Sequence, residues 1–197
     1  MSQTNTTIDT LRKIFSTPNE FFASLKNDGI AKPYGFFSLV GVFFAVLSGL
    51  IGYFQRGASL AVMQRMNVPI PNLGAAWLPL LIVGSYIMLH VGFWIGTTVL
   101  HLFFKIVGGK GSYAQTAQVF AYSASPRLVF GWIPVIGGLA SIWTIVLYFI
   151  SSMKVHKIGG GRATVAIIVL PIVLAIIIGF IVGGAVITAL VANKTMM

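Results

Sequence analysis

The stretch that decides the fold is YGFFSLVGVFFAVLSGLIGYF, residues Tyr34–Phe54, which contains no charged side chain. A helix needs roughly 20 mostly apolar residues to cross a hydrocarbon core of about 30 Å. Two more uncharged stretches meet this requirement, at residues 77–104 and 164–192, and Pro171 predicts a kink near the start of the second. These three stretches predict membrane-spanning helices.

The segment at residues 117–151 is too long for one crossing and long enough for two short ones. Pro134 with Gly137 and Gly138 predicts a turn inside it, and the alternative is a re-entrant segment. The sequence therefore predicts an all-α, polytopic membrane protein with five transmembrane helices over residues 34–197. The predicted spans are residues 34–54, 77–104, 117–132, 135–151 and 164–192.

The composition excludes a water-soluble globular domain. Apolar residues make up 57% of the 197 residues and charged residues only 8%, with a mean hydropathy of +0.93. A soluble domain carries roughly 25% charged residues. The sequence contains no cysteine, which excludes disulfides and thiolate metal sites.

The distribution of the basic residues gives an orientation. They lie beside the apolar stretches, which favours anionic lipid headgroups over nucleic acid as their partner. Nine fall on one side of the five-span arrangement and three, Arg56, Arg65 and Lys194, on the other. Because Lys and Arg concentrate in cytoplasmic loops, we expect a cytoplasmic N-terminus and an outside C-terminus. The nine are Arg12, Lys13, Lys26, Lys32, Lys105, Lys110, Lys154, Lys157 and Arg162.

Residues 1–33 are predicted to form a cytoplasmic segment with a short amphipathic helix at about residues 18–28. The stretch Thr17-Pro18-Asn19-Glu20 is typical of a capping box with proline at the first helical position. This helix either lies on the inner leaflet as an interfacial helix or folds against the cytoplasmic end of the bundle. Its lipid-facing residues would be Phe21, Phe22, Leu25 and Lys26.

Small residues at four-residue spacing predict close helix contacts, because helices in lipid associate through tight packing. Contacts within one bundle are favoured over a dimer interface. The residues are Gly41, Ala45, Gly49, Gly92, Gly96, Ala175, Gly179 and Gly183.

One charged residue, Arg127, falls inside a predicted span. A buried arginine costs roughly 2.5–3.5 kcal/mol or more, and no Asp or Glu follows Asp28. We hypothesise that the helix is broken at Pro126 and that Arg127 faces lipid headgroups or a polar pocket with Tyr122 and Ser123. The alternative is a short helix from which Arg127 reaches the outer interface.

The two histidines His90 and His101 are eleven residues apart and so lie on one face of their helix. Without a Cys, Asp or Glu on another span they form a poor metal site, so we expect structural or interfacial roles. Paired aspartates, a serine with a base and an HExxH helix are all missing from the spans. We therefore expect no enzyme activity, no cofactor and no metal.

Several short motifs follow one another along the chain: FSTPNEFF (15–22), GKGSYAQ (109–115), FAYSASP (120–126), Pro134, Trp143 and the loop at 156–163. In this order they resemble the Yip family of Ypt/Rab-interacting membrane proteins. The resemblance implies five spans, a cytoplasmic N-terminus and no enzymatic activity. Where eukaryotic members carry an acidic Asp-Leu-Tyr-Gly-Pro motif, this chain has Lys32-Pro33-Tyr34-Gly35. This difference argues against GTPase binding and favours a prokaryotic member.

We therefore expect a non-enzymatic, multi-pass protein of the cytoplasmic (cell) membrane that organises lipids or partner proteins. Its partners would be anionic lipids on the cytoplasmic face, together with another membrane protein or further copies of itself. The alternative is a channel or transporter for a small solute or ion, including a homo-oligomeric one, that uses Arg127 and the two histidines at depth.

Overall fold

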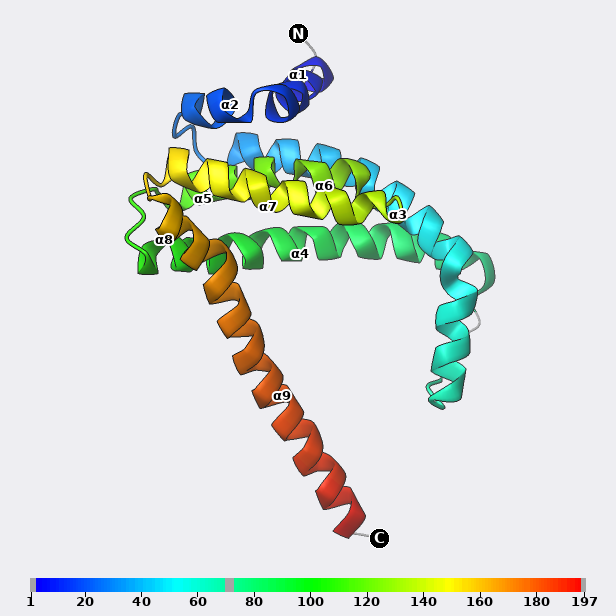
Figure 1. Cartoon of the computed structure of the whole chain (residues 1–197). Helices are drawn as coiled ribbons and strands as arrows, with labels where there is room; N and C mark the ends of the chain where they lie inside the picture. The colour runs from blue at the N-terminus through cyan, green and yellow to red at the C-terminus, as the bar shows by residue number, and fades with distance from the viewer. Residues whose placement is uncertain (1–2, 70–72, 196–197) are drawn as a thin grey trace.

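The computed structural model describes residues 3–69 and 73–195, and every regular element in this part of the chain is a helix (Figure 1). The all-α prediction is therefore confirmed there. The elements are α1 (Gln3–Ser16), α2 (Pro18–Ser24), α3 (Ala31–Arg65), η1 (Gly74–Ala76), α4 (Trp77–Ile106), α5 (Tyr113–Ser123), α6 (Ser125–Phe130), α7 (Ile136–Val155), α8 (Gly160–Thr164), the π-helical turn η2 (Val165–Val169) and α9 (Leu170–Thr195).

Four helical stretches of the described residues are long and apolar enough to cross a membrane. They correspond to four of the five predicted spans. The remaining one, at residues 117–132, is divided between α5 and α6, which have 11 and 6 residues. The ring centroids of Trp132, just after α6, and of Phe43 in α3 lie 6.4 Å apart. Phe43 is only about 18 Å along α3 from the first residue of that helix, which is less than the roughly 30 Å of a hydrocarbon core. Five crossings therefore remain a prediction. The four stretches are Ala31–Gly57, Gly74–Ile106, Ile136–Val155 and Gly160–Ala185.

The helices α3, α4, α5–α6 and α7 run side by side, while α9 and the C-terminal part of α3 leave the bundle (Figure 1). The contact between α3 and α4 uses the small residues of α3. Ala45 is 1% exposed, and a Cβ added at Gly49 would lie 2.5 Å from Cγ1 of Ile82. On α9, by contrast, Gly179 and Gly183 have no atom within 4 Å of such a Cβ. The small residues therefore form contacts within the bundle on α3 but not on α9.

The predicted turn around Pro134 connects α6 to α7. The backbone segments before and after the turn approach each other closely at two glycines, Gly131 and Gly137. A Cβ at Gly137 would lie 2.7 Å from the carbonyl oxygen of Gly131. Val135 adopts a positive φ of 68°, which is uncommon for a β-branched residue. Helix α7 begins directly afterwards, at Ile136.

The N-terminal segment folds against the bundle, which was one of the two predicted alternatives. Ile14 and Phe22 are 0% and 1% exposed and belong to the main hydrophobic core. Helix α2 is shorter than predicted, since it ends at Ser24. Helix α1, which precedes it, was not predicted.

The predicted capping box at Thr17 does not form. Proline does occupy the start of α2, but the Thr17 side chain makes no capping hydrogen bond. The reason is that α1 leads almost directly into α2: the amide of Thr17 donates to the carbonyl of Lys13 at 2.9 Å.

The α3–α4 contact can be tested by Gly49→Leu. The new side chain would meet Ile82, so we expect the free energy of unfolding to fall by about 1–3 kcal/mol. Gly84→Leu is the control, because nothing lies within 4 Å of a Cβ at that position. Thermal unfolding in detergent measures both. An equal loss in the two variants would contradict this contact.

Candidate functional site at the basic end of the bundle

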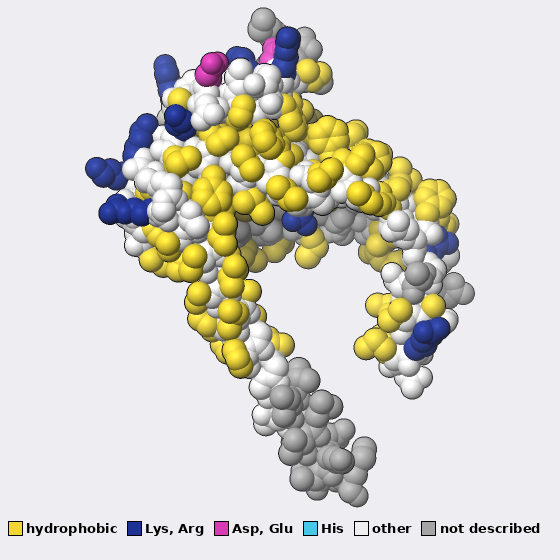
Figure 2. All heavy atoms as spheres, in the orientation of Figure 1, with side chains coloured by type: hydrophobic (Ala, Val, Ile, Leu, Met, Phe, Trp, Pro, Cys, Tyr) yellow, Lys and Arg dark blue, Asp and Glu magenta, His cyan; other side chains and the backbone are white. Residues whose placement is uncertain are grey.

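Basic side chains gather at one end of the bundle, where α3 and α8 begin and α4 and α7 end (Figure 2). We call this the basic end. Lys154 is half-buried there and the other members are exposed. The members are Lys26, Lys32, Lys105, Lys110, Lys154, Lys157 and Arg162.

Hydrogen bonds join the loops of the basic end. The amide of Lys110 donates to the carbonyl of His156 at 3.1 Å, and the side-chain amide of Gln118 donates to the carbonyl of Lys26 at 2.7 Å. A capping box starts α5: the amide of Ser112 donates to Oε1 of Gln115 at 2.9 Å, and the amide of Gln115 donates to the Ser112 hydroxyl at 3.3 Å. The loops are therefore held in place by hydrogen bonds.

Three polar side chains form a chain of contacts behind these loops. Oγ1 of Thr116 lies 2.7 Å from Nδ1 of His101 and 3.2 Å from Nε2 of His156. The hydroxyl of Thr116 also donates to the carbonyl of Ser112 at 3.3 Å. The contacts connect α4, α5 and the end of α7, and we call them the His–Thr–His chain.

The contacts of this chain favour an uncharged His156. A hydroxyl has one proton, so Thr116 donates to one of its three partners at a time. Nδ1 of His156 is buried and has no hydrogen-bond partner among the described residues, and a Cβ at Gly111 would lie 2.5 Å from it. A doubly protonated imidazole would therefore bury an N–H group without an acceptor, which favours the neutral ring.

The surroundings of His156 oppose its protonation. Its ring is 0% exposed and stacks on Phe104 with 4.1 Å between the ring centroids. Burial, followed by the nearby His101 and Lys105, lowers the pKa of His156 to about 4. A neutral, buried histidine of this kind is suited to joining helices and not to proton transfer near pH 7.

The other predicted histidine, His90, lies in a separate site. Its Nδ1 donates to the carbonyl of Tyr86 at 2.8 Å. Its Nε2 can then accept from the hydroxyl of Ser38 at 3.0 Å. Both nitrogens are satisfied between α3 and α4, so His90 and His101 lie on one helix but contact different partners. Among the described residues, no three His, Cys, Asp or Glu side chains lie close enough to hold a metal ion.

The structure separates Arg127 from its predicted partners. The helix is interrupted at Ala124, close to the predicted break, and Pro126 is buried near the start of α6. Arg127 itself is exposed, and its guanidinium has no hydrogen bond or ion pair within the described chain. The Ser123 hydroxyl instead lies 3.1 Å from that of Ser151, and Tyr122 packs on Phe21 and Phe36. Arg127 lines none of the cavities described below.

The four residues predicted to contact lipid differ in how deeply the fold buries them. Phe22 is buried in the core, because α2 packs on α7. Phe21 and Leu25 are half-buried, and Lys26 is exposed at the basic end. Of these four residues, only Lys26 is exposed. Contact of the four residues with lipid therefore remains a prediction.

His156 and Thr116 were not predicted to take part in a buried polar contact between helices. His156 lies between Val155 and Lys157, where a histidine in a basic loop suggests an exposed interfacial position. The available signal was Ser112 followed three residues later by Gln115. This capping-box pattern fixes the start of α5 and the position of Thr116 one residue further on.

The buried His156 predicts a pH-dependent stability. Its pKa of about 4 in the folded chain lies below the value of roughly 6.5 for an unfolded chain. Between these values the unfolded state binds a proton that the folded state does not, so the free energy of unfolding falls as the pH falls from about 6.5 to about 4. The loss should reach roughly 1–3 kcal/mol and stop below that window.

Unfolding measured against pH tests this in His156→Phe, which keeps the ring stacking and removes the titrating group. We expect a flatter profile in that variant. Val155→Ala is the control, because it removes a buried neighbour but no titrating group, and it should lower stability without changing the slope. A profile as steep in His156→Phe as in the original chain would contradict the assignment.

One comparison with known proteins finds a family. The family model described as the Yip1 domain matches residues 12–190, which include α2 to α8, the basic end and the His–Thr–His chain. No curated protein and no solved structure matches the chain. Because the match covers far more than half of the sequence, the chain belongs to the Yip1-domain family of membrane proteins.

Proposed function

We propose that this Yip1-domain protein is a non-enzymatic protein of the cell membrane that gathers anionic lipids at its basic end. The observation that carries the proposal is the lack of neutralising charge there. Among the described residues the only ion pair is between Lys32 and Asp28, at 2.8 Å. The hydrogen bond from Lys32, followed by its charge, lowers the pKa of Asp28. The remaining cations of the basic end form no ion pair in the described chain.

Lipid phosphates are the partners that suit these cations. The basic end lies where the apolar helices begin and end, which is the depth of headgroups for a membrane-spanning bundle. Each Lys or Arg near an anionic surface is worth about 1 kcal/mol. The positive-inside rule assigns this end to the cytoplasmic face, with a cytoplasmic N-terminus and, for five crossings, an outside C-terminus.

Partner proteins or further copies of the chain remain a second part of the proposal. Helix α9 supports it, because large apolar side chains such as Phe180 and Ile181 are 80% and 66% exposed. Such a surface contacts lipid or another apolar helix.

A solute pathway receives no support from the geometry. Its proposed residues do not share a site: His90 is satisfied between α3 and α4, His101 contacts Thr116, and Arg127 is exposed on α6.

The lipid proposal is tested by removing two charges at the basic end with Lys110→Gln and Lys157→Gln together. Thermal unfolding in mixed micelles of detergent with phosphatidylglycerol or phosphatidylcholine is the measurement. We expect phosphatidylglycerol to stabilise the original chain, and the double variant to lose about 2 kcal/mol of that stabilisation at low salt. Added salt should weaken the effect in the original chain as well.

The matched control is Arg56→Gln with Arg65→Gln, which removes the same charge away from the basic end. This pair should keep most of the stabilisation by phosphatidylglycerol. Equal stabilisation of the original chain by both lipids would refute the proposal, and so would an equal loss in the two double variants.

A further inference from the structure

Among its described side chains, helix α9 packs against the bundle near its start, through Leu170 and Leu174. Ala163 of α8 and Ala166 of η2, just before α9, are fully buried, whereas the large apolar residues of α9 from Ile176 to Val182 are exposed. Irregular helix geometry occurs at this point, since the π-helical turn η2 and Pro171 lie at the junction. Figure 1 shows α9 crossing α4 and then diverging from it.

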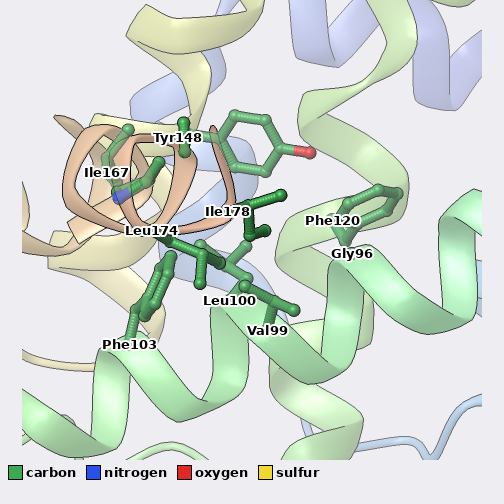
Figure 3. A pocket seen from close by; sticks show the side chains of 11 residues that line it. Gly96, Val99, Leu100, Phe103, Phe120, Tyr148, Ile167, Leu174 and Ile178 are labelled. Carbon is green, nitrogen blue, oxygen red and sulfur yellow. The ribbon is translucent and has the colours of Figure 1, made fainter. Parts of the chain in front are cut away.

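The divergence leaves an apolar cavity of about 370 Å³ between α4 and α9. The rings of Phe120 from α5 and Tyr148 from α7 close its inner side (Figure 3). The volume is in the range of small-molecule sites. The cavity, which we call the α4–α9 groove, is lined by Gly96, Val99, Leu100, Phe103, Phe120, Tyr148, Ile167, Pro171, Leu174, Ala175 and Ile178.

The chemistry of the lining calls for a hydrocarbon. The hydroxyl of Tyr148 is the only polar side-chain group among the residues that line the groove. A water molecule needs two to four polar partners, so an apolar cavity does not hold it. The groove lies between segments that are candidates for membrane spans, Gly74–Ile106 and Gly160–Ala185. The solvent at that depth is the acyl chains of lipids.

A second cavity of about 480 Å³ comes next along the same two helices, toward the basic end. It is lined by Ile106 at the end of α4 with Val107 and Gly108, and by Gly161 and Arg162 of α8 and Val165 of η2. A Cβ at Gly108 would lie 3.5 Å from Nη1 of Arg162, so the guanidinium lies against this glycine. The guanidinium of Arg162 has no ion pair or hydrogen bond within the described residues.

Arginine is well suited to the phosphate of a lipid. Its planar guanidinium can donate two parallel hydrogen bonds to phosphate oxygens. Arg162 precedes Ile167 of the groove by five residues, about 7.5 Å along a helix. A cation at the headgroup end and a hydrocarbon cavity next to it match the two parts of one phospholipid.

We propose that the α4–α9 groove binds one acyl chain of an anionic phospholipid whose phosphate contacts Arg162. This inference rests on the proposed gathering of anionic lipid and adds a defined site to it. The lipid fills the space that the divergence of α9 leaves open.

The test uses proteoliposomes that contain a trace of phosphatidylglycerol carrying a diazirine in its acyl chain. After illumination, mass spectrometry of peptides locates the adducts. We expect adducts on groove residues of α4 and α9 to exceed those on other exposed apolar residues several-fold. Ala175→Phe and, from the other wall, Val99→Trp should fill the groove and reduce these adducts several-fold, whereas Val173→Phe, which does not line the groove, should leave them unchanged.

The headgroup is tested with Arg162→Gln and with a phosphatidylcholine probe that carries the same tail. Arg162→Gln should reduce labelling by phosphatidylglycerol to the level of the phosphatidylcholine probe. Equal labelling by both probes in the original chain would overturn the anionic assignment. Circular dichroism and thermal unfolding show whether each variant is folded, and two groove variants guard against the failure of one.

Two results would overturn the groove itself. One is an even spread of adducts over all exposed apolar helices that neither groove variant changes. The other is an efficient disulfide between Val99→Cys and Ala175→Cys in the bilayer, since it would mean that α9 closes onto α4. Either result can occur while phosphatidylglycerol still stabilises the chain through Lys110 and Lys157, so failure of the groove and failure of the proposed function are distinguishable.

Discussion

The whole arrangement depends on where unpaired positive charge can be placed. The chain has thirteen Lys and Arg and three Asp and Glu, and no acidic residue follows Asp28. Apart from Lys32, which pairs with Asp28, the Lys and Arg side chains beyond that point form no ion pair among the described residues. An unpaired charge in hydrocarbon is costly. Helices α4 and α7 therefore end, and α8 begins, where their flanking Lys and Arg reach water or headgroups. The depth of the bundle in the membrane follows from this placement.

Behind the charged surface, polar groups are satisfied by local contacts. Thr116 joins His101 and His156 across three elements, and the amide of Lys110 fixes the loop beside His156. Neutral histidines suit this position, because a protonated one would add charge beside Lys105. The same end thus combines an exposed layer of cations with a buried, uncharged layer that holds the helix ends together. We infer that the second layer keeps the cations in a fixed arrangement.

Hydropathy was sufficient to predict most of the long helices. Residues 34–54 and 77–104 fall within α3 and α4, and the small residues Gly41, Ala45 and Gly49 were correctly predicted to pack tightly, since both features depend on local sequence. The position of α1 and α2 was not predictable in this way. Phe22 has the same spacing whether its helix faces lipid or protein, and only the tertiary contact with α7 decides between them.

The candidate site was less predictable for a similar reason. Arg127 was singled out because an arginine in an apolar segment is costly, but the broken helix α5–α6 leaves it exposed. His156 was not singled out because it stands in a basic stretch with Lys154 and Lys157, although the fold buries it completely. Burial of a single polar residue depends on which loops cover it, here those containing Gly111 and Lys110. Hydrophobic periodicity carries no information about such loops.

The most direct test of this account is the side of the membrane on which the basic end lies. The chain has no cysteine, so single cysteines at Lys110, Lys157 and Asn67 can be labelled with a membrane-impermeant maleimide in intact cells and in inverted vesicles. The account predicts that positions 110 and 157 react only from the cytoplasmic side and position 67, in the connection between α3 and α4, only from the opposite side. Labelling of positions 110 and 67 from the same side would contradict it.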